Sequence, residues 1–182
     1  TTDRLALLTK RRDLREQSHA AVKAAGDALL PVLNDTQKVR ALMSLLIEMV
    51  HREVDDLNRN NVRLNAVGDL SQLPEKTREA LEEGMAKTAS NTGLQLHLAI
   101  SYGSRAEIVE AAKRLARAAM SGRIGPEEID EATVAKHLFT AGIPDPDLMI
   151  RTGGDRRISN FLMWQLAYAE LWFSDVLWPD FG

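Results

Sequence analysis

The sequence predicts an α/β protein in which a parallel-rich sheet is flanked by helices. The first observation is an alternation of patterns along the chain, in the order helix, strand, helix, strand, two helices, strand, helix, strand. The second is that two strand-like runs end in glycine turns followed by arginine, at 101–105 and 151–157. In parallel sheets ligands bind beyond the carboxyl ends of the strands, so these turns are the first place to look for a site. A length of 182 residues suits a single domain, 1–182, with a real core.

Helices are indicated where apolar residues recur every three or four positions and capping residues precede them. Asn34, Asp35 and Thr36 offer a cap, and the apolar face that follows covers 39–50 before the pattern ends near Asn58. Pro74 suits the first turn of the next helix. The predicted helices are 1–30, 39–50 with its extension, the segment from Pro74 to about residue 90, 108–120, 126–139 and 161–168.

Strands are indicated by short apolar or alternating runs that are bounded by turn residues. The run 62–68 alternates apolar and polar residues and ends on Gly68, whereas 148–150 is continuously apolar. The predicted strands are 62–68, 94–100, 148–150 and 171–173. No internal repeat, linker or low-complexity segment divides the chain.

Composition excludes several classes of protein. A net charge of −3 argues against general binding of nucleic acid. The absence of cysteine excludes disulfides and thiolate chemistry and fits a reducing, cytoplasmic location. The four histidines lack metal-ligand spacing, and we expect no transmembrane segment and no signal peptide. The basic residues of the first helix most simply make a solvated face, with association with a membrane surface as the alternative.

The stretch from Asp147 to Gln165 combines the parts of an anion site. A strand leads to Gly153 and Gly154, three arginines follow (Arg151, Arg156 and Arg157), and Ser159 or Asn160 could cap the helix predicted over 161–168. Arginine forks and a helix N-terminus both bind phosphate well. The alternative is that the arginines only neutralise nearby carboxylates and that the serine only caps.

The C-terminal quarter is rich in aromatic residues, since seven of the nine lie after residue 160. We interpret this region as core or as a subunit interface in preference to an aromatic ligand cage. Glu170 stands among apolar neighbours at a helix-to-strand junction, where a carboxylate needs an arginine or a cation as partner. Because a phosphate site is predicted nearby, Mg²⁺ is a plausible partner for Glu170.

The run from Leu148 to Leu171, followed by Val176–Phe181, resembles the C-terminal signature of cis-prenyltransferases of the undecaprenyl diphosphate synthase type. Shorter upstream runs match in the same order, and the resemblance covers residues 39–181. These runs are Ala41–Met43, Asn61–Leu64, Val67–Asp69, Asn91–Leu94 and Ile100–Gly103.

The resemblance implies a cis-prenyltransferase that condenses isopentenyl diphosphate with an allylic diphosphate such as farnesyl diphosphate, giving a cis-polyprenyl diphosphate. It implies that Arg151, Arg157, Ile158 and Ser159 bind isopentenyl diphosphate and that Glu170 holds Mg²⁺, the expected cofactor. It further implies that 39–50 and 94–100 help to wall a tunnel for the growing chain, and that the aromatic region forms a homodimer, or a heteromer with a related chain.

The sequence departs from the family in its first 35 residues, which match none of the family's N-terminal motifs. The Asp-Gly-Asn-Gly-Arg-Trp-Ala turn with the catalytic aspartate is absent, so the catalytic residue of this chain is unknown. Ser104 replaces a second glycine, Asp155 stands where glutamate is common, and the family's arginine-rich tail does not follow Gly182. Two hypotheses therefore remain open. The chain belongs to an enzyme, or it is a non-catalytic or partner-dependent homologue that keeps the isopentenyl diphosphate half-site.

Overall fold

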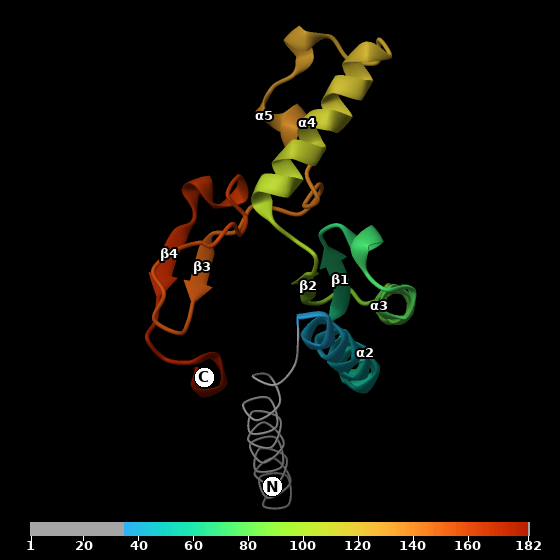
Figure 1. Cartoon of the computed structure of the whole chain (residues 1–182), viewed down its shortest axis with the longest axis vertical. Helices are drawn as coiled ribbons and strands as arrows, with labels where there is room; N and C mark the ends of the chain where they lie inside the picture. The colour runs from blue at the N-terminus through green and yellow to red at the C-terminus, as the bar shows by residue number, and fades with distance from the viewer. Residues whose placement is uncertain (1–34, 182) are drawn as a thin grey trace, which may run out of the picture. The chain divides into compact units, whose positions relative to one another are not determined.

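The computed structural model describes residues 35–181 (Figure 1). The helix predicted over 1–30 lies outside these residues. The described residues up to Leu45 and the residues Leu46–Phe181 belong to two separate compact units, which are described each by itself. The single domain predicted from the sequence stays a prediction. The candidate site lies wholly within the unit Leu46–Phe181.

Helices and parallel strands alternate as the sequence predicts, and the α/β class is confirmed. The α-helices are α2 (Asp35–Arg59), α3 (Glu75–Thr88), α4 (Ser104–Met120) and α5 (Glu131–Ala135). Short 3-10 helices are η1 (Leu70–Gln72), η2 (Pro126–Glu128), η3 (Gln165–Tyr168) and η4 (Trp178–Asp180). The strands are β1 (Arg63–Val67), β2 (Gln95–Ala99), β3 (Leu148–Arg151) and β4 (Glu170–Phe173).

The four strands form two separate parallel pairs instead of one continuous sheet (Figure 1). β1 pairs with β2 so that Arg63 lies opposite Gln95. β3 pairs with β4 so that Leu148 lies opposite Glu170. All four predicted strands are therefore found. The alternation of elements shows that strands are parallel, but it does not show which strands are neighbours.

The core of the larger unit forms where α3 packs on β1. Leu64 and Leu81 are almost fully buried. Gly84 of α3 allows close packing, because a Cβ at this position would lie 2.7 Å from the Cγ1 atom of Val50 and 3.3 Å from Leu64. Thr88 closes the same contact, since its Oγ1 accepts a hydrogen bond from the Leu64 backbone N–H at 3.0 Å.

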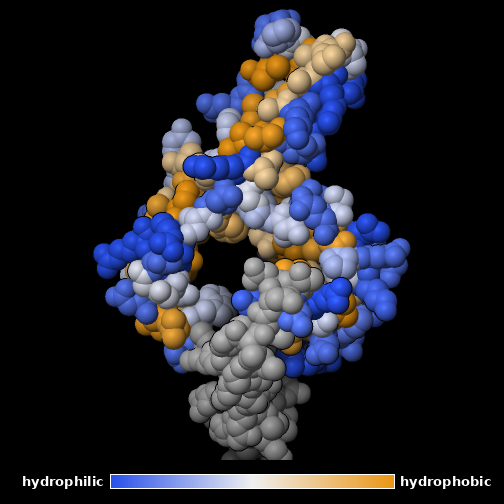
Figure 2. All heavy atoms as spheres, viewed as in Figure 1, coloured by the Kyte–Doolittle hydropathy of each residue, from blue (hydrophilic) through white to orange (hydrophobic). Residues whose placement is uncertain are grey.

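A buried carboxylate joins the start of α4 to two later segments of the chain. Glu107 is only 1% exposed. Its Oε1 accepts from the Phe139 backbone N–H at 2.8 Å, and its Oε2 accepts from the Tyr102 hydroxyl and from Gln165 Nε2. A buried carboxylate is stable only when hydrogen bonds of this kind replace its water. Glu107 therefore fixes the first turn of α4 against the segments that contain Phe139 and Gln165. Figure 2 shows apolar residues over the region that contains α4 and α5.

Two helix predictions are wrong in detail. The predicted helix 126–139 is η2 followed by the short α5. The predicted helix 161–168 forms only as η3. Ser159, Asn160 and Leu162 have φ angles of 48°, 61° and 47°, which are incompatible with a right-handed helix. The N–H of Met163 donates to Ser104 Oγ at 2.7 Å, so contacts with α4 replace the expected helical turn.

Candidate anion-binding site

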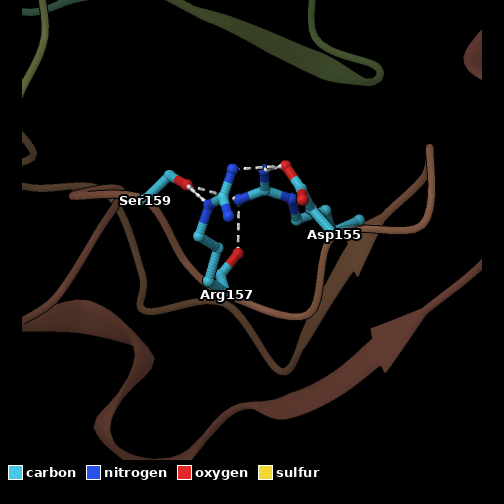
Figure 3. A network of polar contacts seen from close by, with 4 residues as sticks. Asp155, Arg157 and Ser159 are labelled. Carbon is cyan, nitrogen blue, oxygen red and sulfur yellow. Dashed lines mark hydrogen bonds and ion pairs between the residues drawn. The ribbon is translucent and has the colours of Figure 1, made fainter.

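Two arginine side chains converge on one carboxylate oxygen just beyond the carboxyl end of β3 (Figure 3). Asp155 Oδ2 accepts from an NH2 group of Arg151 and from an NH2 group of Arg157, each at 2.7 Å. Arg151 also donates from Nη1 to the Arg157 carbonyl and, at 2.7 Å, to Ser159 Oγ. The structure thus brings together three of the predicted site residues, Arg151, Arg157 and Ser159.

The Ser159 hydroxyl oxygen accepts a hydrogen bond from each arginine, and these two bonds do not use the hydroxyl proton. Its Oγ accepts from Arg151 Nη1 at 2.7 Å and from Arg157 Nε at 3.2 Å. A hydroxyl has two acceptor lone pairs and one donor, so these contacts use both lone pairs. The O–H can therefore donate to an anion that binds beside the two guanidinium groups.

The two arginines have different surroundings. The Arg151 side chain is 24% exposed, whereas that of Arg157 is 67% exposed. Arg151 donates to three groups of its own loop, which holds the loop in shape. Arg157 donates only to Asp155 and Ser159 among the described residues, so most of its guanidinium edge faces solvent. Arg157 is the residue best placed to contact a ligand.

Asn160 fastens this loop to the N-terminus of α4. Its Oδ1 accepts from the Arg105 backbone N–H at 2.8 Å, and its carbonyl accepts from the Ser104 N–H at 2.9 Å. These are two of the N–H groups that lack partners within a helix. The prediction that Ser159 or Asn160 caps a helix over 161–168 is wrong, because Asn160 instead caps α4, 55 residues earlier in the chain. Local sequence gives no signal for such a contact.

The Gly-Gly turn shapes the loop without cradling a ligand. Gly153 and Gly154 have φ angles of 86° and 83°, which glycine adopts without strain. Their N–H groups donate to the carbonyls of Val176 and Ser174, at 2.9 and 3.0 Å. These donors are already satisfied, so the backbone of this turn offers no free N–H group to a ligand. The anion site consists of side chains.

Ile158 and Arg156 lie in the same loop but outside the network. The Ile158 side chain is half-buried, and its carbonyl accepts from the Phe161 N–H at 3.1 Å. Its predicted role in substrate binding stays a prediction. Arg156 is exposed and makes no contact with Asp155 or Ser159, so the third arginine of the predicted cluster lies outside the network.

Glu170 does not share a site with the arginines in a single chain. It pairs with Leu148 at the start of the β3–β4 sheet, whereas Arg151 pairs with Phe173 at the other end. Three residues of strand correspond to about 10 Å, and residues an odd number of positions apart face opposite sides of a sheet. Glu170 is exposed, and no group of three metal-ligating side chains occurs within residues 35–181. The described residues thus do not form a Mg²⁺ site together with the anion loop.

The aromatic C-terminal region is exposed, so the interpretation as core is wrong for most of it. Tyr168 is 97% exposed, Trp178 73% and Trp172 63%. Trp172 lies on the same face of the β3–β4 sheet as Leu148 and Ile150, which are also exposed. An apolar sheet face of this kind is typical of an interface. The interpretation as a subunit interface stays a prediction.

The tunnel walls that the resemblance implies are 39–50 and 94–100. Val39, Leu42, Leu45 and Met49 of α2 are exposed. His97 and Ala99 of β2 line a cavity of about 140 Å³. The other lining residues are Val67, Thr140, Ile143, Pro144, Pro146, Phe161, Leu162 and Gln165. A cavity of this size is too small for a long polyprenyl chain, and the tunnel stays a prediction.

Comparisons with known proteins place the chain in a class of α/β enzymes that transfer prenyl groups. Residues 33–182 match the prenyltransferase family model described as "Putative undecaprenyl diphosphate synthase". An isoprenyl transferase of Porphyromonas gingivalis is 58% identical over 145 residues, which are 80% of this chain and 57% of that protein. An isoprenyl transferase of Heliobacterium mobile is 50% identical over 145 residues, 80% of this chain and 56% of that protein.

A solved structure shows the same fold. Lavandulyl diphosphate synthase from Lavandula x intermedia, crystallised with dimethylallyl diphosphate, matches with a TM-score of 0.78 and 37% identity. The match covers 82% of this chain and 65% of that chain. The chain belongs to the prenyltransferase family of undecaprenyl diphosphate synthases and isoprenyl transferases, as the resemblance predicted. It spans a little over half the length of the curated relatives that it matches.

Proposed function

We propose that this chain carries the isopentenyl diphosphate half-site of a cis-prenyltransferase. In this function the arginine loop holds the diphosphate of isopentenyl diphosphate, while an allylic diphosphate such as farnesyl diphosphate supplies the growing chain. The observation that carries the proposal is that Arg151 and Arg157 converge at 2.7 Å on a single oxygen, Oδ2 of Asp155, with Ser159 between them. Two guanidinium groups that are directed at one point suit a diphosphate, because its oxygens can accept hydrogen bonds from several charged donors.

The chemistry of the family explains why such a site is needed. The alkene of isopentenyl diphosphate must lie against the carbon from which the allylic diphosphate departs, which is a problem of positioning. A diphosphate held by two arginines and a hydroxyl fixes one end of the substrate and leaves the apolar end to reach the reacting carbon. The loop is in turn fixed by Asn160 and by three donors of Arg151. A fixed loop loses little entropy when the substrate binds.

A partner-dependent role is the second candidate function. The sequence lacks the family motif with the catalytic aspartate, and the face formed by Leu148, Ile150 and Trp172 is exposed. This surface suits a homodimer or a heteromer with a related chain that supplies the aspartate. Robust formation of long polyprenyl diphosphate by the purified 182-residue chain would contradict this candidate. Activity that appears only after mixing with an aspartate-bearing chain would support it.

Magnesium enters the proposal only as a single-carboxylate contact at Glu170. Mg²⁺ is often bound by one or two carboxylates together with substrate phosphates, so an exposed glutamate can serve as one ligand. When bound, the ion would neutralise a departing diphosphate. Glu170 lies at the end of the β3–β4 sheet that is remote from the arginine loop. Among the described residues, no helix combines the length and apolarity needed to cross a membrane. A cytoplasmic location stays a prediction.

The test is calorimetric titration of isopentenyl diphosphate into the wild-type chain and into Arg157→Ala. Hydrogen bonds to charged groups contribute about 1.5–3 kcal/mol, so the variant is expected to bind about tenfold to one-hundredfold more weakly. Ser159→Ala is expected to show a smaller loss in the same direction. Both variants should keep the thermal stability of the wild type to within a few degrees, because these side chains are exposed.

Arg156→Ala is the matched control. It removes the same charge from the adjacent position, where the side chain makes no contact with the network. Its affinity should stay within about twofold of the wild type, as expected for an exposed charge without a direct contact. Equal losses for Arg156→Ala and Arg157→Ala would show that only the general charge of the loop matters, and the proposed site would be wrong.

A further inference from the structure

The oxygen on which the two arginines converge belongs to the protein itself. Asp155 Oδ2 lies 2.7 Å from an NH2 group of each arginine, and Figure 3 shows the carboxylate facing both guanidinium groups. A phosphate oxygen bound between the same two groups would need the same donors. Asp155 thus takes the place of an anionic ligand in this conformation.

The geometry points to Asp155 as an internal competitor that sets the affinity of the arginine loop for a diphosphate. This inference rests on the proposed function. Asp155 holds the guanidinium groups together while the site is empty of ligand, and a diphosphate must displace the carboxylate in order to reach the same NH2 groups. A residue of the loop itself therefore competes with the ligand for the two arginines.

The charges support displacement over a fixed structural role. Two arginines and one aspartate leave a net charge of +1 on the network, whereas the arginines alone would carry +2. The Asp155 side chain is 43% exposed. Ion pairs that are partly exposed are weak, so a multiply charged ligand can break them. A buried carboxylate such as Glu107 could not leave its partners in this way.

Few contacts hold the Asp155 side chain in place. The carboxylate accepts only from the two arginines among the described residues. Arg151, in contrast, keeps its bonds to the Arg157 carbonyl and to Ser159 when Asp155 leaves. The arginines therefore remain oriented without the aspartate.

The experiment is calorimetric titration of inorganic diphosphate into the 182-residue chain and into Asp155→Asn. Asparagine keeps the shape of the side chain but removes its charge. We expect Asp155→Asn to bind inorganic diphosphate about tenfold more tightly, which corresponds to about 1.4 kcal/mol. Without ligand the variant should unfold at a slightly lower temperature, and diphosphate should raise that temperature by more than it does for the wild type. Asp155→Ala serves as a second variant and should also bind more tightly.

Asp145→Asn is the control for general charge. Asp145 is exposed in the loop before β3 and makes no ion pair with the arginines. Its affinity should match that of the wild type. Tighter binding by both aspartate variants to the same extent would mean that only long-range charge is involved, and the inference would be wrong.

The outcomes separate this inference from the proposed function. If Arg157→Ala loses binding while Asp155→Asn binds equally or more weakly, the anion site stands, and Asp155 orients the arginines instead of competing. If the wild type, Asp155→Asn and Asp155→Ala all fail to bind inorganic diphosphate, the proposed site and the inference both fail. Binding that appears only in the Asp155 variants would support the inference strongly.

Discussion

Asn160→Ala is the substitution that tests most directly how the fold supports the anion loop. Asn160 caps α4 through Oδ1, which accepts from the Arg105 N–H at 2.8 Å. Loss of such a cap costs about 1 kcal/mol. Asn160 also has a φ angle of 61°, where asparagine is tolerated and alanine costs roughly a further 1 kcal/mol. The expected loss is therefore about 2 kcal/mol in the free energy of unfolding.

Thermal unfolding followed by circular dichroism measures this loss. In a protein of this size 1 kcal/mol corresponds to about 2–4 °C, so the midpoint should fall by about 4–8 °C. Asn160→Gly separates the two contributions, because glycine keeps the backbone conformation but lacks the cap. It should lose about half as much. Asn160→Asp keeps an acceptor and should stay near the wild type.

The same variants report on the link between the cap and the site. Ser159 directly precedes Asn160, so a displaced loop should weaken the binding of isopentenyl diphosphate in Asn160→Ala, and Asn160→Asp should restore it. An unchanged midpoint in Asn160→Ala would refute the capping contact. A lower midpoint with unchanged affinity would show that Asn160 stabilises α4 without positioning Ser159.

Two further predictions concern titration and the metal ligand. Burial and the hydrogen bond to Glu107 raise the pKa of Tyr102 to about 12. The folded-state pKa lies above the usual value of about 10, so the stability that protonated Tyr102 contributes is complete below pH 10 and is lost as the pH rises through 12. The free energy of unfolding in urea should therefore fall more steeply over this range for the wild type than for Tyr102→Phe; parallel curves would contradict the pKa. Glu170→Gln should bind inorganic diphosphate within about twofold of the wild type in the absence of Mg²⁺. About 10 Å of strand separates Glu170 from Arg151, and at 0.1 M salt the interaction of charges this far apart is largely screened. A large change measured by calorimetry would show that Glu170 and the arginine loop act as one site.

The strands and long helices could be predicted because their patterns are local. The predicted strand 94–100 contains β2, and 62–68 contains β1, since alternation and flanking turn residues mark both. The start of α4 was predicted at Ile108, four residues later than its true start at Ser104. Asn160 supplies the missing cap from a distant part of the chain. Helix ends that depend on tertiary contacts cannot be found from local pattern.

The run 161–168 shows the opposite error, because here the local pattern predicts a helix that does not form. Its spacing predicts a helix, but Leu162 has a φ angle of 47° and Met163 donates to Ser104 Oγ. Gln165 is 3% exposed and donates to Glu107 and to Thr140 Oγ1. These polar contacts with α4 and the Thr140 loop outweigh the weak helical preference of a short segment. The periodicity also misplaces burial, because Tyr168 is 97% exposed whereas the polar Gln165 is buried.

Residues of the candidate site could be predicted from the sequence, but the partners that they contact could not. The clustering of Arg151, Arg157 and Ser159 within nine positions predicts an anion site, because a turn after a strand must bring such close neighbours together. The alternative, that the arginines neutralise nearby carboxylates, is found in the structure at Asp155, and the contact of Asp155 with both arginines depends on the loop geometry.

The position of Glu170 relative to the arginines depends on the register in which β3 pairs with β4. Leu148, Ile150 and Trp172 share the face of Glu170, whereas Arg151 shares a face with Met149 and Phe173. A shift of one residue in the pairing of β3 with β4 would reverse this assignment, and no pattern within either four-residue strand fixes the register. A carboxylate that is close in sequence to an arginine cluster is therefore weak evidence for a shared metal site, and the pairing of the strands must be known before the two are combined.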